Sequence, residues 1–225
     1  MTWVVANLGL IWARMLDHVV LSLPPIVLCF VIAVPLGWLA RRYRVSRGII
    51  LTGAGLLYAV PSLPLFFVLP AVIGTGLRSP LNVIIALTLY GVALMVRVVA
   101  DGLESVDADV RQSASAVGYS AWSRFWQVEL PLAGPVLLAG MRVVAVSTVS
   151  LVTVGAVIGV QSLGSLFTDG FQRGIQAEII AGLVATVALA LIFDGALVLA
   201  GRVLMPWTRK VAAVRAPAPA EVAAA

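Results

Sequence analysis

Residues 101–131 read DGLESVDADVRQSASAVGYSAWSRFWQVELP and form the one polar, charged interruption of this length in a strongly apolar chain. This polar segment holds five of the ten acidic residues. Its pattern predicts two short amphipathic helices separated by a glycine, not a membrane span. Asp107 and Ser120 are the predicted N-caps, and Gly118 is predicted to end the first helix in the left-handed conformation. Contact with a soluble partner is the simplest function for such a segment.

Aromatic side chains gather in the second of these helices. Trp122, Phe125 and Trp126 are spaced i, i+3 and i+4 and therefore share one side of it. Arg124 and Glu129 fall on its polar positions. We expect Trp122 and Trp126 to pack against the ends of the chain's own spans. The first helix carries small residues at 113–116 and is narrow enough to enter a partner's groove.

The composition excludes a soluble globular protein. Of the 225 residues, 61% are apolar and 11% are charged, and the mean hydropathy is +1.08. Soluble domains carry about a quarter charged residues. Only helices and closed barrels can cross lipid, because backbone polar groups find no water there. The apolar runs are continuous and do not alternate, so the fold class expected is an all-α membrane protein.

About five transmembrane helices are predicted from runs of roughly 20 apolar residues. They lie near 19–40, 48–73, 81–96, 132–160 and 178–201. Residues 1–18 are expected to be an external amphipathic lead-in, and 161–177 an exposed loop. Residues 19–207 then form the transmembrane domain, and the Ala/Pro-rich tail 208–225 is expected to be disordered.

The distribution of basic residues predicts the orientation. If the basic loop RRYRVSR (41–47) lies in the cytoplasm, 12 of the 15 basic residues fall on that side, and only Arg14, Arg78 and Arg173 fall outside. Because short cytoplasmic loops are enriched in Arg and Lys, we expect the N-terminus outside and the C-terminus in the cytoplasm. The polar segment is then cytoplasmic. The same rule accounts for the basic loop better than lipid or nucleic-acid binding does, and no nucleic-acid partner is expected.

The second span carries three prolines, Pro61, Pro64 and Pro70. Each removes a backbone donor, so the span is expected to be broken. Broken spans often mark a translocation path, although a packing kink explains them equally well. The candidate path residues are Pro61, Ser62, Tyr90, Ser147 and Thr148.

Catalytic and metal chemistry is not expected in this chain. It has one histidine, His18, one cysteine, Cys29, and one lysine, Lys210 in the tail. A zinc site of the His/Cys type needs more ligands, and a phosphate-binding loop needs a lysine in a motif that is missing here. No cofactor is therefore expected in this chain. If ATP and Mg²⁺ drive its function, they bind to a partner.

Asp194 is an acid within the fifth predicted span. An ionisable residue there is a functional hypothesis by default, so Asp194 could bind a proton or a cation. Arg142 in the fourth span is predicted to lie near the same end and could pair with it. A structural ion pair, or snorkelling of the side chain towards the membrane surface, is the favoured interpretation.

Residues 112–131 resemble the loop of the permeases of binding-protein-dependent ABC importers. The pattern of that loop is Glu-Ala-Ala, three residues, Gly, nine residues, Ile, one residue, Leu-Pro. Here Gln112, Ser113 and Ala114 take the first three places, Gly118 is in register, Val128 stands for the Ile, and Leu130 and Pro131 match. Gln112-Ser113 in place of Glu-Ala removes a carboxylate, and with it any ion pair made there.

Other stretches are similar to the permeases of osmoprotectant uptake systems. They are LDHVVLSLPP (16–25), AVPSLPLF (59–66), TGLRSPLNVIIALTLYG (75–91), VELPLAGPVLLAGMR (128–142) and IGVQSLGSLFTDGF (158–171). The last departs from that family's Ile-Gly-Ala-Gly-Gly-Leu-Gly element at residues 160–162. The resemblance covers residues 16–207.

The resemblance implies a bacterial inner-membrane permease of the type I ABC importer fold, with the polar segment as its coupling loop. The implied partners are two ATP-binding subunits, a second permease chain, identical or related, an external substrate-binding protein and membrane lipid. The implied solutes are compatible solutes such as glycine betaine, carnitine, choline or proline. The alternatives are a permease for an amino acid such as methionine, and an ion-coupled secondary transporter that uses Asp194.

Overall fold

The computed structural model describes residues 2–208, and within this range every regular element is a helix. The elements are α1 (Thr2–Ala6), α2 (Leu8–Arg42), α3 (Arg44–Ala59), α4 (Ser62–Ile73), α5 (Pro80–Glu104), α6 (Ala108–Ala116), α7 (Ala121–Arg124), the π-helix η1 (Phe125–Glu129), α8 (Leu130–Val152), the 3₁₀-helix η2 (Thr153–Ile158), α9 (Gly164–Arg173) and α10 (Gln176–Leu204). Of the tail predicted at 208–225, all but Thr208 lies outside the described residues.

The predicted spans are confirmed in number. Helices α2, α5 and α10 and the stretch Ala121–Ile158 that contains α8 are each long and apolar enough to cross a membrane. Helices α3 and α4 qualify together as a fifth span, bent by 105°. The break lies where prolines predicted it. Val60 and Pro61 are extended, with ψ of 127° and 134°, as expected before a proline and at a residue without an N–H group.

The first long helix begins earlier than the sequence suggested. The predicted span started at residue 19, after a separate lead-in, whereas α2 already starts at Leu8. His18 explains the difference, because its side chain is fully buried and its Nε2 lies 2.9 Å from the carbonyl oxygen of Val149. His18 precedes the predicted start of the span at residue 19, yet it lies inside the bundle.

The stretch 161–177 was predicted to be an exposed loop, and this prediction was wrong. Its residues form α9, and Ser162, Leu163 and Leu166 are buried. Gly164 allows the approach: a Cβ there would stand 2.1 Å from the carbonyl oxygen of Thr153. The mostly polar sequence concealed a packed helix because only a few of its residues, Leu163 and Leu166 among them, enter the core, and because the close contact at Gly164 has no sequence signal.

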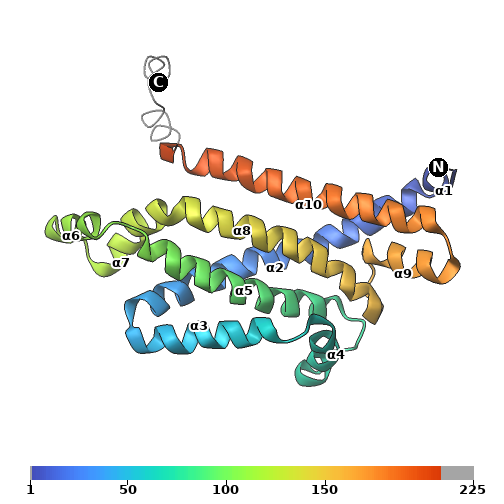
Figure 1. Cartoon of the computed structure of the whole chain (residues 1–225), viewed down its shortest axis with the longest axis horizontal. Coiled ribbons are helices and arrows are strands. Elements are labelled where there is room, and N and C mark those ends of the chain that lie inside the picture. The colour runs from blue at the N-terminus through green and yellow to red at the C-terminus, as the bar shows by residue number, and fades with distance from the viewer. Residues whose placement is uncertain (1, 209–225) are drawn as a thin grey trace, which may run out of the picture.

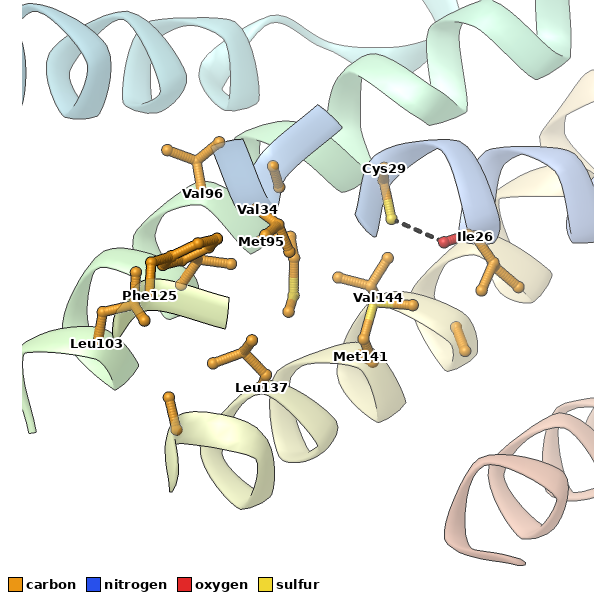
Figure 2. Close-up of a cluster of buried hydrophobic side chains, with 14 of the residues drawn as sticks. Ile26, Cys29, Val34, Met95, Val96, Leu103, Phe125, Leu137, Met141 and Val144 are labelled. Carbon is orange, nitrogen blue, oxygen red and sulfur yellow. Dashed lines mark hydrogen bonds between the residues drawn. The ribbon is translucent and has the colours of Figure 1, made fainter. Parts of the chain in front are cut away.

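The largest core cluster joins α2, α5 and α8 (Figure 2). Ile26, Cys29 and Val34 come from α2. They meet Met95, Val96 and Leu103 of α5 and Leu137, Met141 and Val144 of α8. Phe125 of η1 enters the same cluster and is only 2% exposed. The polar segment is therefore anchored in the core by Phe125 and, near its start, by Leu103 and Val106.

Functional elements lie at the two ends of the bundle (Figure 1). Helices α6 and α7 lie at the same end as the turn between α2 and α3. Helices α1, α4 and α9 lie at the opposite end. Helix α10 runs along the outer side of the bundle and is the least buried of the four unbroken spans, with 11% of its most apolar window buried.

The packing of α2 on α5 makes a prediction about Gly37. A Cβ at this position would lie 2.5 Å from Cγ1 of Val99, so Gly37→Ala must push the helices apart. Overpacking of this kind costs about 1–3 kcal/mol. We expect the purified Gly37→Ala variant to unfold at a lower temperature than the wild type. Gly53→Ala is the matched control, because no atom lies within 4 Å of its added Cβ. Equal melting temperatures for the two variants would contradict the packing described here.

Candidate coupling site and translocation path

Helix α6 stands on the surface of the molecule. Its N-terminus is capped as predicted, since Oδ1 of Asp107 accepts a hydrogen bond of 2.8 Å from the N–H group of Asp109. The guanidinium group of Arg111 donates to the carbonyl of Val106 and fastens the helix to the chain before it. None of the α6 residues is buried. Most of its surface is therefore available to a partner, while Arg111 and Ala114 are half-buried and Ser115 accepts a hydrogen bond from Arg124.

Gly118 ends α6 in the way predicted. Its φ is +98°. Its N–H group donates to the carbonyl oxygen of Ser115 at 3.0 Å, and the N–H group of Tyr119 donates to the carbonyl oxygen of Ala114 at 3.1 Å. A left-handed residue with this pair of bonds is a common helix C-terminus. A Cβ at Gly118 would meet nothing within 4 Å, so the backbone conformation, and not space, demands glycine.

The residues that match the family loop divide into two groups. Gln112, Ser113 and Gly118 are exposed, and Ala114 is half-buried beside them. Val117, also on this surface, is 80% exposed. By contrast, the remaining matching residues are half-buried where the chain enters α8: Val128, Leu130 and Pro131. Only the first group offers a surface to a partner. The second group packs where η1 continues into α8.

The second helix of the polar segment is capped as predicted, with the Ser123 N–H group 3.2 Å from Oγ of Ser120. The expectation for its aromatic residues was only partly right. Phe125 is the ring that fills the core, whereas Trp122 and Trp126 are 61% and 46% exposed. Trp122 does reach Trp38 of α2, with ring centroids 5.9 Å apart. The two indoles thus flank the anchoring ring and leave much of their own surface free.

Glu129 was predicted on a polar position, and this prediction was wrong. Its side chain is 2% exposed and lies between two arginines. Arg124 donates through Nε to Oε1 at 2.7 Å, and Arg41 of α2 donates through Nη1 to Oε2. A buried charge requires such partners. No local sequence pattern indicates the pair with Arg41, which lies 88 residues away.

Three candidate path residues meet in one small cavity between α5 and α8. Tyr90, Ser147 and Thr148 line it together with Tyr58 of α3, which the sequence did not single out. The hydroxyl of Tyr90 donates to the carbonyl of Val60 at the break between α3 and α4. Pro61 and Ser62 follow directly on Val60. The candidates therefore gather around the break between α3 and α4, where the carbonyl oxygen of Val60 accepts its hydrogen bond from the Tyr90 hydroxyl.

Arg142 and Asp194 form the ion pair that the sequence suggested. Nε and Nη2 of Arg142 lie 2.6 and 2.7 Å from Oδ1 and Oδ2 of Asp194. This two-bond arrangement is the strongest geometry for an arginine and a carboxylate. It joins α8 to α10 and occupies both oxygens of the acid. Within residues 2–208, no group of three His, Cys, Asp or Glu side chains is placed to hold a metal ion.

With this geometry established, comparison with known proteins identifies the family. Residues 33–210 match the family model of the binding-protein-dependent transport system inner membrane component. The chain belongs to this family. It is a multi-pass inner-membrane protein and a permease subunit of an ABC importer.

Two relatives illustrate the similarity of the permease to characterised systems. It is 29% identical to the glycine betaine/carnitine/choline transport system permease protein OpuCB of Bacillus subtilis, over 92% of this chain and 94% of the relative. It is 31% identical to the osmoprotectant import permease protein OsmW of Salmonella typhimurium, over 84% and 88% of the two chains.

Solved structures establish the fold of the permease. An inward-facing structure of the MetNI methionine ABC transporter matches with a TM-score of 0.78 at 18% identity, over 88% of this chain and 98% of the other. An amino acid ABC transporter matches with a TM-score of 0.66 at 12% identity, over 93% and 97%. The permease therefore has the type I ABC importer fold, as predicted.

The pair between α8 and α10 makes a testable prediction. Asp194→Leu leaves the Arg142 guanidinium without its carboxylate, whereas Arg142→Leu with Asp194→Leu removes both charges. If the pair is structural, the single variant lowers the melting temperature of the purified permease more than the double variant does. Arg142→Leu alone is measured as well. If the double variant loses as much stability as the two single variants added together, the two residues do not interact.

Proposed function

We propose that the permease forms the translocation path of an ATP-driven importer for compatible solutes, such as glycine betaine, carnitine, choline or proline. The observation that carries the coupling part of this proposal is the exposed α6, capped by Asp107 and ended by Gly118. The similarity to OpuCB, a glycine betaine/carnitine/choline permease, and to OsmW, an osmoprotectant import permease, supports the solute class.

The partner proposed for α6 is an ATP-binding subunit, present in two copies, that holds ATP and Mg²⁺. Gln112, Ser113, Ala114 and Gly118 form the proposed docking surface, and Val128, Leu130 and Pro131 position it. Because Gln112 and Ser113 are neutral, hydrogen bonds replace the ion pair that an acid would make there. The basic residues around 41–47 favour the cytoplasm as the side on which this contact forms, with the N-terminus outside.

Transport is proposed to follow a two-state change. Two permease chains, identical or related, enclose the path, and an external binding protein delivers the solute to the end of the bundle that carries α9. ATP binding brings the two α6 helices together and switches the path from inward- to outward-facing. Tyr90, Ser147 and Thr148, with Pro61 and Ser62 at the break, are proposed to line the path.

The solute is proposed to be recognised mainly by the binding protein. Quaternary ammonium groups bind to aromatic cages through cation–π contacts, and a cage suits a high-affinity receptor. The permease needs only weak contacts along its path, for which a tyrosine and hydroxyl groups suffice. The fold alone is shared with the methionine and amino acid transporters, so it does not favour those solutes. Against ion coupling at Asp194 stands its engagement by Arg142 through both oxygens.

Reconstitution tests the proposed function directly. The permease is placed in lipid vesicles with its ATP-binding subunit and binding protein, and uptake of radiolabelled glycine betaine, carnitine, choline and proline is measured. We expect uptake only with ATP and all subunits. Uptake by the permease alone, driven by an ion gradient and abolished in Asp194→Asn, would instead identify a secondary transporter.

Gly118 provides a second test within the same complex. A β-branched residue is strongly strained at a φ of +98°, so Gly118→Val should misplace the end of α6. We expect solute uptake to fall by about tenfold or more, which corresponds to a coupling of about 1.4 kcal/mol. Insertion into the membrane should be unchanged. Gly118→Asn is the matched control, since Asn tolerates positive φ better, and its loss should be smaller. Equal losses would contradict a conformational role for this glycine.

A further inference from the structure

We propose that the turn between α2 and α3 is a clamp that holds both ends of the polar segment and passes its movement to α2 and α3. The clamp consists of Arg41, in the last turn of α2, and Arg47, in the first turn of α3. Arg41 binds Glu129, where the chain enters α8, and Arg47 binds Glu104, where α5 ends. The inference rests on the proposed function, because it concerns how docking at α6 reaches the path.

The connection at Glu129 is the buried half of the clamp. The carboxylate is 2% exposed and receives Arg41 from α2 and Arg124 from α7. Arg124 also donates to Oγ of Ser115, in α6 itself. A continuous series of hydrogen bonds therefore leads from α6 through Arg124 and Glu129 to α2. Hydrogen bonds between charged groups are stronger in such a buried site than in water.

The connection at Arg47 is the exposed half of the clamp. Nη1 of Arg47 lies 2.7 Å from Oε2 of Glu104, and Nη2 lies 3.7 Å from Oδ1 of Asp101. These acids are 59% and 58% exposed, and ion pairs in solvent contribute little. The clamp is thus asymmetric: Arg41 supplies the firm attachment, and Arg47 adds a weak one at the other end of the polar segment.

Aromatic packing reinforces the buried half. Trp38 lies one turn before Arg41, and its ring centroid is 5.7 Å from that of Phe125 and 5.9 Å from that of Trp122. The guanidinium of Arg42 lies 5.6 Å from the centroid of the Trp38 ring. The end of α2 therefore holds the second half of the polar segment by charge and by ring contacts together.

A π-helix occupies the joint itself. Residues Phe125–Glu129 form η1, and its first and last residues are the two that are buried. Such wide turns are rare and occur often at functional sites. Here η1 directs Phe125 into the core and Glu129 towards Arg41. A displacement of α6 is thereby transmitted to α2 as well as to α8, and α2 is followed directly by the broken span α3–α4.

The test breaks the clamp without leaving a buried charge unpaired. In Arg41→Gln, Glu129 keeps Arg124, so the fold should persist. The wild-type and variant permeases are reconstituted in vesicles with the ATP-binding subunit and the binding protein, and glycine betaine uptake and ATP hydrolysis are measured together. We expect the solute carried per ATP hydrolysed to fall about fivefold or more, within the usual range of coupling between sites. The melting temperature and the amount of bound ATP-binding subunit should stay near wild type.

Arg14→Gln is the matched control. It makes the same substitution on the same helix, in a partly buried i,i+3 pair with Asp17 at the other end of α2, and should leave the ratio unchanged. Arg41→Lys keeps the charge but not the planar guanidinium, and we expect a smaller loss. A wild-type ratio in Arg41→Gln, or in Arg41→Lys if the first variant does not assemble, would overturn the clamp. Absence of ATP-dependent uptake in the wild-type complex would instead overturn the proposed function.

Discussion

The close approach of α2, α5 and α8 is the constraint on which the rest of the structure depends. Gly37 of α2 faces Val99 of α5, and Gly140 of α8 faces Val98 on the same helix. Because lipid supplies no hydrophobic force between helices, such association depends on tight contacts at small residues. The three helices form one compact unit, against which the broken span and the polar segment take up their positions.

That unit links the two proposed functional regions of the permease. Tyr90 and Thr148 belong to α5 and α8, and these helices end at the polar segment, which Phe125 and Glu129 join to the core. The proposed path and the proposed docking helix are therefore connected through the same packed helices. A displacement at one end reaches the other through packed helices, since no flexible linker separates them.

Local chemistry made much of this predictable from the sequence. The caps at Asp107 and Ser120, the end of α6 at Gly118 and the break before Pro61 depend on a residue and its immediate neighbours, and all were found. Tyr90, Ser147 and Thr148 were recognisable as polar residues within spans. The burial of Glu129 was not predictable, because it depends on Arg41, which is remote in the chain. The packing of α9 was missed for the same reason: the contact at Gly164 exists only once α8 and η2 are in place.

Helix α10 relates to the bilayer differently from the other spans. At 29 residues it is about 44 Å long, whereas the hydrocarbon layer is about 30 Å thick, so the helix must tilt or extend among the headgroups. Little of it is shielded by protein, and Arg142 joins it to α8 through Asp194. In a thinner or thicker bilayer we therefore expect the tilt of α10 to change first. The ion pair joins α10 to α8, which carries Ser147 and Thr148, so we expect bilayer thickness to act on α8 through this pair.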